Sequence, residues 1–177
     1  MLTGRTLRLS LVALFALLSA CKKEDTPKEA VIDFGPGDGL SYRSSNNMPN
    51  GTQDPTDWTL DGPWNAREQA LFQSLGLDVN GPARGSATIS GAFPNPATTG
   101  VQFGYSIPGM AVQKIVIVDS NYRVITETSS ANPSAGVQFI FDLTRNGFQK
   151  GQRYRLYYVL YNGTTLYYKG HGDIKVD

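Results

Sequence analysis

Cysteine and histidine, the side chains most often used as nucleophile, metal ligand or general base, each occur once among 177 residues, as Cys21 and His171. One cysteine excludes an internal disulfide and a cysteine-rich zinc site, and one histidine excludes a metal site built on several imidazoles. Sixteen basic residues balance fifteen acidic ones, which argues against the basic surface of a nucleic-acid-binding protein. We therefore expect no cofactor, no metal and no nucleic-acid partner.

The one histidine lies in the run Gly170-His171-Gly172-Asp173. An imidazole beside a carboxylate can act as a general base, so a hydrolase centred on His171 is one hypothesis. No nucleophile motif such as Gly-x-Ser-x-Gly accompanies it, and an exposed histidine in a turn is the favoured interpretation. We accordingly expect no catalytic residue and a protein that is not an enzyme.

Acidic and indole side chains gather in residues 54–64. Asp54, Asp57 and Asp61 could offer oxygens to Ca²⁺, but their spacing is not that of an EF-hand loop, and capping of turns is favoured. Trp58 and Trp64 would stack on sugar rings if they were exposed, which makes them candidate ligand-binding residues. If buried, they would attach this segment to the rest of the fold, and we favour that interpretation.

Tyrosines crowd the last predicted hairpin, at positions 154, 157, 158, 161, 167 and 168. Alternation along a strand places Tyr154 and Tyr158 on one face and Tyr157 and Tyr161 on the other. One of these faces should be core. The face with Tyr157 and Tyr161 is the best candidate for a ligand or partner surface, because tyrosine is favoured at interfaces, although an exposed sheet without a ligand is the simpler interpretation.

The N-terminal residues have the pattern of a secretory signal. Arg5 and Arg8 begin it, and the apolar run 9–20 is about 12 residues long, whereas a membrane-spanning helix needs ~20. Its end, Leu18-Ser19-Ala20-Cys21, resembles the bacterial lipobox. The resemblance implies that the Cys21 thiol is alkylated by a diacylglyceryl group and that the chain is cut before Cys21, so that the acyl chains would hold the protein on a membrane.

The charged run Lys22-Lys23-Glu24-Asp25 is similar to the signal that directs lipoproteins to the outer face in Bacteroidota-type bacteria. A plain solvated linker, with the protein on the periplasmic face of the outer membrane, is the alternative. We expect a signal peptide at 1–20, a flexible tether at 21–30, a loop-rich segment at 31–84 and a folded domain at 85–177.

One helix is predicted at residues 65–75, because Asn65 and Glu68 have the spacing of a capping box and Gly76 can end the helix. A short strand is also possible at 40–43. From residue 85 on, apolar and polar residues alternate, and strands are predicted at 86–92, 101–107, 114–119, 124–128, 137–142, 154–161 and 165–168, with a closing piece at 174–176. Turn signals such as Pro108-Gly109 and Asn162-Gly163 separate them. The pattern predicts an all-β fold, an antiparallel β-sandwich of about seven strands, Ig-like, preceded by the loop segment and helix.

The second half of the chain resembles the C-terminal sorting domain of the type IX secretion system. The resemblance rests on Phe93-Pro94-Asn95-Pro96-Ala97, on residues 116–124 and on Gly151-Gln152-Arg153-Tyr154, and Tyr122 stands where that family usually has glycine. It implies a small β-sandwich. Since the lipobox already supplies a route to the membrane, we carry over the fold and not the sorting role.

These patterns predict a bacterial lipoprotein anchored to the outer membrane through Cys21, on the cell surface or the periplasmic face. It would act as a non-enzymatic binding or structural module of the cell envelope, with a glycan or an envelope protein as partner. A carbohydrate-recognition accessory protein of a polysaccharide-uptake system is the alternative, and the hydrolase at His171 is the third hypothesis.

Overall fold

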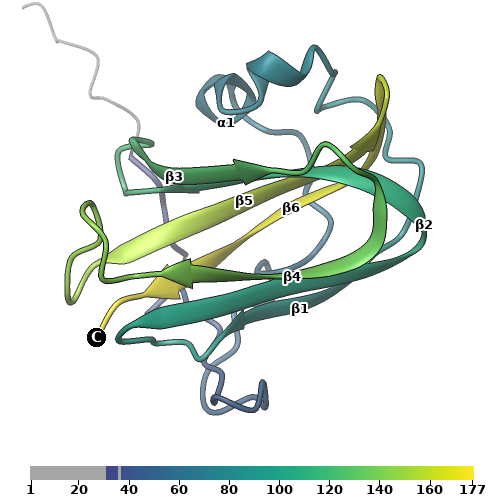
Figure 1. The fold of residues 1–177 in the computed structure, drawn as a ribbon. Helices are drawn as coiled ribbons and strands as arrows, with labels where there is room; N and C mark the ends of the chain where they lie inside the picture. The colour runs from purple at the N-terminus through teal and green to yellow at the C-terminus, as the bar shows by residue number, and fades with distance from the viewer. Residues whose placement is uncertain (1–30, 36) are drawn as a thin grey trace, which may run out of the picture.

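The computed structural model describes residues 31–35 and 37–177, so Cys21, the predicted signal peptide and the tether lie outside the described residues. Six antiparallel strands form one curled sheet: β1 (Thr88–Phe93), β2 (Gly100–Val118), β3 (Val124–Ser129), β4 (Ser134–Asp142), β5 (Arg153–Asn162) and β6 (Thr165–Lys175) (Figure 1). They are preceded by a short helix, α1 (Ala66–Ala70), and a 3₁₀ turn, η1 (Gln73–Leu75). The prediction of an all-β antiparallel fold is confirmed. Within the described part, no helix is long and apolar enough to cross a membrane.

The long strand β2 belongs to both layers of the fold. Residues 100–106 pair with β1 and β4, and residues 112–118 pair with β3 and β5, beyond which β6 follows. The strand curves between the two halves, so that the sheet folds back on itself (Figure 1). The prediction of a turn at Pro108-Gly109 is wrong: the chain continues and the register with β4 is interrupted there instead. A proline that cannot donate and a neighbouring glycine loosen the pairing enough for the bend.

Strand β6 runs through both the strand predicted at 165–168 and the start of the closing piece predicted at 174–176. Gly170 and Gly172 therefore lie within a strand and not in a turn. The predicted helix keeps its start, since the Asn65–Glu68 capping box is present, but α1 is short and η1 follows it up to Gly76, which has a φ of 61°. The predicted strand at 40–43 is wrong, because only isolated bridges involve Arg43.

The main core lies between the two layers of the sheet, where alternate residues of β2 and β5 point inward. Phe103, Tyr158 and Ile117 are fully buried there. A second core lies on the opposite face of β2 and β5. Its members come from the strands and from the segment 31–84: Ile32, Phe34, Trp64, Phe72, Val79, Val116, Val118, Tyr157, Val159 and Leu166. The loop-rich segment is therefore a third layer that covers this face of the sheet.

Candidate functional site

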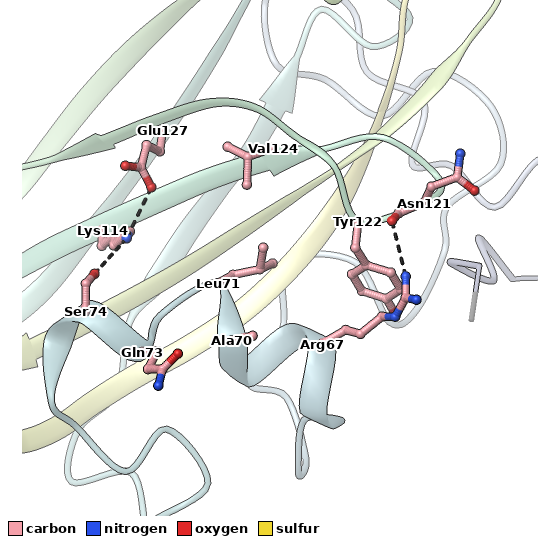
Figure 2. Close-up of a pocket in the computed structure, with 10 residues that line it drawn as sticks. All are labelled: Arg67, Ala70, Leu71, Gln73, Ser74, Lys114, Asn121, Tyr122, Val124 and Glu127. Atoms are coloured by element: carbon pink, nitrogen blue, oxygen red, sulfur yellow. Dashed lines mark hydrogen bonds and ion pairs between the residues drawn. The ribbon is translucent and has the colours of Figure 1, made fainter. Parts of the chain in front are cut away.

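An open groove of about 780 Å³ lies between the helical segment and strand β3 (Figure 2). One wall is made by α1 and η1, and the other by β2, β3 and the turn that joins them. The residues that line it are Arg67, Ala70, Leu71, Gln73, Ser74, Lys114, Asn121, Tyr122, Val124 and Glu127. The groove exists because the residues on either side of α1, Trp64 and Phe72, pack on the sheet and hold the helix above it.

The middle of the groove is apolar. Leu71 and Val124 face each other across it, with Ala70 beside them (Figure 2). Val124 is 46 % exposed, which is high for a branched aliphatic side chain in a strand. An apolar side chain or sugar face placed here would remove this surface from water.

One end of the groove holds a fixed ion pair. The Lys114 ammonium donates a hydrogen bond to Ser74 Oγ at 3.1 Å and lies 3.1 Å from Glu127 Oε2. It also lies over the ring of Phe72, 5.9 Å from the ring centroid. Lys114 is buried and held by these three contacts, which preorganises its ammonium group, whereas the Glu127 side chain is 57 % exposed.

The other end of the groove is aromatic and cationic. Tyr122 takes a left-handed backbone conformation, with φ 63°, at the position where the sorting-domain family usually has glycine. Asn65 donates to the Tyr122 hydroxyl at 3.1 Å, and the Arg67 guanidinium lies 5.8 Å from the ring centroid. Arg67 also donates to the Asn121 carbonyl at 3.4 Å. The guanidinium thus lies over one face of the half-buried Tyr122 ring, and the two stacked groups form a platform at this end of the groove.

A smaller cavity of about 370 Å³ surrounds His171. The imidazole is not exposed in a turn, which corrects the favoured interpretation: its side chain is 16 % exposed and its Nδ1 lies 2.8 Å from Asp61 Oδ2. Asp61 also accepts a bond from Trp64 Nε1 at 2.7 Å. Burial lowers the pKa of His171, but the hydrogen bond and charge of Asp61 outweigh burial and leave the pKa raised.

The hydrogen bond between His171 and Asp61 has a structural role. Within the described residues the ring of His171 makes hydrogen bonds to Asp61 alone, and the hydroxyls of Thr56 and Thr59, which also line the cavity, are not bonded to it. In the same part of the chain, no cluster of three or more histidine, cysteine or acidic residues could hold a metal ion. The pair fastens the loop at Asp61 to strand β6.

The three aspartates considered for calcium serve separate hydrogen-bond sets. Asp54 accepts from the amide of Thr56, and Asp61 accepts from His171 and Trp64. Asp57 is buried and accepts from the backbone amides of Ser41 and Asp173. Burial, together with the nearby charge of Asp173, raises the pKa of Asp57 to about 7. The carboxylates of Asp57 and Asp61 therefore tie the segment 41–61 to strand β6, whereas that of Asp54 is used within the segment.

The predicted ligand-binding aromatic residues are mostly buried. Trp58 is 9 % exposed and packs on Phe103, while Trp64 is 4 % exposed and packs on Phe72 and Tyr157. Tyr157 is fully buried, and its hydroxyl donates to Glu68 at 2.9 Å. Tyr161 is half-buried at the edge of the same core. Neither indole nor Tyr157 offers a free ring face to a sugar, because Trp58 lies in the main core and the segment 31–84 covers the side of β5 on which Trp64 and Tyr157 lie.

The Pro-Asn-Pro sequence that carries the family resemblance is also part of the scaffold. Asn95 is 1 % exposed, and its amide donates to the carbonyls of Ser41 and Asp173 and accepts from the Lys175 amide. Its backbone exchanges two further hydrogen bonds with Arg43, each 2.8 Å long. Asn95 therefore joins the loop segment to β6 and is not available to a ligand.

Sequence reasoning did not identify the groove residues Arg67, Lys114 and Tyr122. Their types are ordinary and they come from separate segments, and the one local signal was tyrosine at the glycine-like turn position 122. A scan of this chain against protein-family models finds no match, and a search of the curated proteins finds no similar sequence.

Proposed function

We propose that this protein is a lipid-anchored binding module of the bacterial cell envelope. In this proposal Cys21 is acylated and attaches the chain to the outer membrane, and the groove between α1 and β3 holds an extended envelope polymer. The chemistry is binding and not catalysis. The groove carries the proposal, because it is a preorganised concave surface with an apolar middle and polar ends.

The position of the groove relative to the N-terminus supports the proposal. The amide of Ile32 donates to the carbonyl of Ser120 at 2.8 Å, directly beside Asn121 and Tyr122 in the groove wall. Ten residues separate Cys21 from Ile32, and the eleven Cα–Cα steps between the two can span at most ~40 Å. A chain acylated at Cys21 would therefore keep this end of the groove close to the bilayer and to the polymers next to it.

A carbohydrate is the second candidate ligand, and the platform of Tyr122 and Arg67 favours it. Sugar rings offer apolar faces to aromatic rings and hydroxyls to planar polar groups, and Arg67 and Asn121 supply such groups beside Tyr122 (Figure 2). This assigns carbohydrate recognition to the groove, in place of Trp58 and Trp64. The ion pair at Lys114 would accept or donate further hydrogen bonds at the far end.

The anchor is tested by replacing Cys21 with alanine. We expect the unchanged chain to begin at Cys21 and to carry acyl groups, and we expect the Cys21→Ala chain to carry none, because only the thiol can form the thioether. Mass spectrometry of the N-terminal peptide, purified from membranes, measures both. Lys22→Ala is the matched control and should be acylated normally. An unmodified Cys21 in the unchanged chain would contradict the proposed anchor.

The groove is tested by replacing Arg67 with alanine. A panel of glycans and of peptides from envelope polymers would be screened with the unchanged protein, and the best ligand titrated. Loss of the guanidinium should weaken its binding at least tenfold, since Arg67 supplies both a charge and one face of the platform. Arg145→Ala removes the same charge from an exposed site outside the groove and should leave affinity unchanged. Equal affinity for the Arg67→Ala protein would refute the groove as the binding surface.

A further inference from the structure

Most edges of the sheet are protected against pairing with another strand. The outer edge of β6 receives backbone hydrogen bonds from the amides of Trp58, Asp61, Arg84, Gly85 and Ala97. Strand β1 has a bulge between Ile89 and Gly91, and the Arg43 side chain lies close to Gly91. Strand β3 has an irregular register near Val124 and carries the charged Glu127. Bulges, charges and covering segments are the usual means of blocking edge pairing.

Between Gly136 and Phe141, strand β4 carries neither a bulge nor a charge, although Arg145 and Phe148 share a cavity with Ile140 near its C-terminal end. It pairs with β2 on one side in unbroken register, from Gly136 opposite Ser106 to Asp142 opposite Gly100. Among the described residues, no other strand pairs with its second side. Residues 134–141 contain no charge and no proline, and the core of this stretch is Val137-Gln138-Phe139-Ile140-Phe141. A regular, uncharged, β-branched and aromatic edge is a template for a further strand.

The side chains around this edge are also incompletely covered. Ile140 is 76 % exposed, more than any other large apolar side chain described. Val137 and Phe139 point toward the main core but are only partly buried, at the margin where the two layers are open. A strand added beside β4 would cover all three of these side chains and satisfy the free backbone groups.

We propose that β4 pairs with β4 of a second copy of this chain, antiparallel and about a two-fold axis at Gln138. The strand is complementary to itself in this arrangement. Ile140 of one copy would lie opposite Gly136 of the other, where the missing side chain leaves room for it. Asp142 would lie opposite Ser134, so the single charged residue of the strand meets no like charge. The pairing joins the β1-β2-β4 layers of the two copies into one continuous sheet.

Cysteine cross-linking of the full chain in its own membranes tests this dimer. A cysteine introduced by Gln138→Cys lies at the proposed axis, within about 5.5 Å of its counterpart across an antiparallel pair. Mild oxidation, or a short thiol-reactive cross-linker, should yield a covalent dimer on a non-reducing gel. The unchanged chain controls for any reaction of Cys21, and Asn162→Cys, at the end of β5 beside the turn to β6, controls for random collisions.

A second change tests the surface itself. Adding Ile140→Lys to Gln138→Cys should reduce the cross-linked fraction at least tenfold, because a lysine on an open edge opposes pairing. Ile140 is mostly exposed, so the chain should fold normally. Val124→Lys, at the exposed apolar residue of β3, is the matched control and should leave the dimer intact. Cross-linking of Gln138→Cys no stronger than that of Asn162→Cys, or unaffected by Ile140→Lys, would overturn the proposal.

Discussion

Replacing Arg155 by methionine is expected to lower the free energy of unfolding by about 3–5 kcal/mol. Arg155 donates from Nε and from one terminal nitrogen to the two carboxylate oxygens of Asp173, and each bond is 2.7 Å long. Asp173 is 1 % exposed. Methionine fills much of the volume but leaves a buried carboxylate without its cation. Denaturation with urea or guanidinium, followed by fluorescence, measures the loss.

Arg155→Met removes more stabilising contacts than the ion pair with Asp173. The same side chain donates to the carbonyl of Asp33 at 2.9 Å and so holds the start of the third layer against β5. Asp57 is hydrogen-bonded to the Asp173 amide, and the pKa of Asp57 is already raised to about 7 by burial and by the Asp173 charge. Without Arg155, two acidic groups would share a buried site that contains less positive charge.

The neighbouring Arg153 provides the matched control for Arg155. Its guanidinium lies 4.7 Å from the ring centroid of Phe34 and donates to the Asp38 carbonyl, in a position that is partly exposed. Arg153→Met should lower the free energy of unfolding by at most ~1 kcal/mol, because removing this guanidinium leaves no buried carboxylate without a cation. Similar losses for the two variants would mean that the burial of the Arg155–Asp173 pair has little energetic importance. Adding Asp173→Asn to Arg155→Met should restore part of the stability.

Local sequence patterns predicted the parts of the fold that depend on neighbours in the chain. Alternation predicted most of the strands, and Asn162-Gly163 predicted the final hairpin, in which Asn162 pairs with Thr165. The capping box at Asn65 and the left-handed Gly76 could also be predicted from the sequence, because caps involve residues three or four positions apart. Such signals need no knowledge of tertiary contacts.

The features that were missed depend on what packs against a residue. The alternation of tyrosines in β5 correctly separated two faces, with Tyr158 in the main core and Tyr157 on the other side. It could not reveal that the segment 31–84 covers the second face, since that segment has little periodicity. The groove could not be predicted for the same reason, because it forms only through tertiary packing. Arg67 and Tyr122 are far apart in sequence and meet only after α1 has packed on the sheet.

Glycine is the residue for which the sequence was most ambiguous. Gly170 and Gly172 were interpreted as a turn around His171, but they lie within β6 and allow the loop residues Trp58 and Thr59 to approach the strand closely. The amide of Trp58 donates to the carbonyl of His171 at 2.7 Å, which brings the loop directly onto the strand. A Cβ at Gly172 would overlap atoms of the Trp58 ring, and one at Gly170 would overlap the Thr59 carbonyl. Glycine in a strand can therefore mark close packing as well as a turn.

Gly172→Ala is therefore expected to lower the free energy of unfolding by about 3 kcal/mol, the upper end of the range for overpacking. The Trp58 ring cannot easily move away, because its backbone is bonded to β6 and its other side packs against Phe103 at a centroid distance of 5.7 Å. Denaturant unfolding measures the change, and near-ultraviolet circular dichroism should report an altered indole environment.

Gly62→Ala is the matched control, since Gly62 lies in the same covering segment and a Cβ there would have no neighbour within 4 Å. Its backbone does not require glycine, so the substitution should change stability by at most ~1 kcal/mol, with a small gain from the less flexible unfolded chain. If Gly172→Ala were as mild as Gly62→Ala, the loop carrying Trp58 would be free to lift from β6. The attachment of the third layer would then depend on the buried pair of Arg155 and Asp173 and on the apolar contacts of Phe72, and not on close backbone packing.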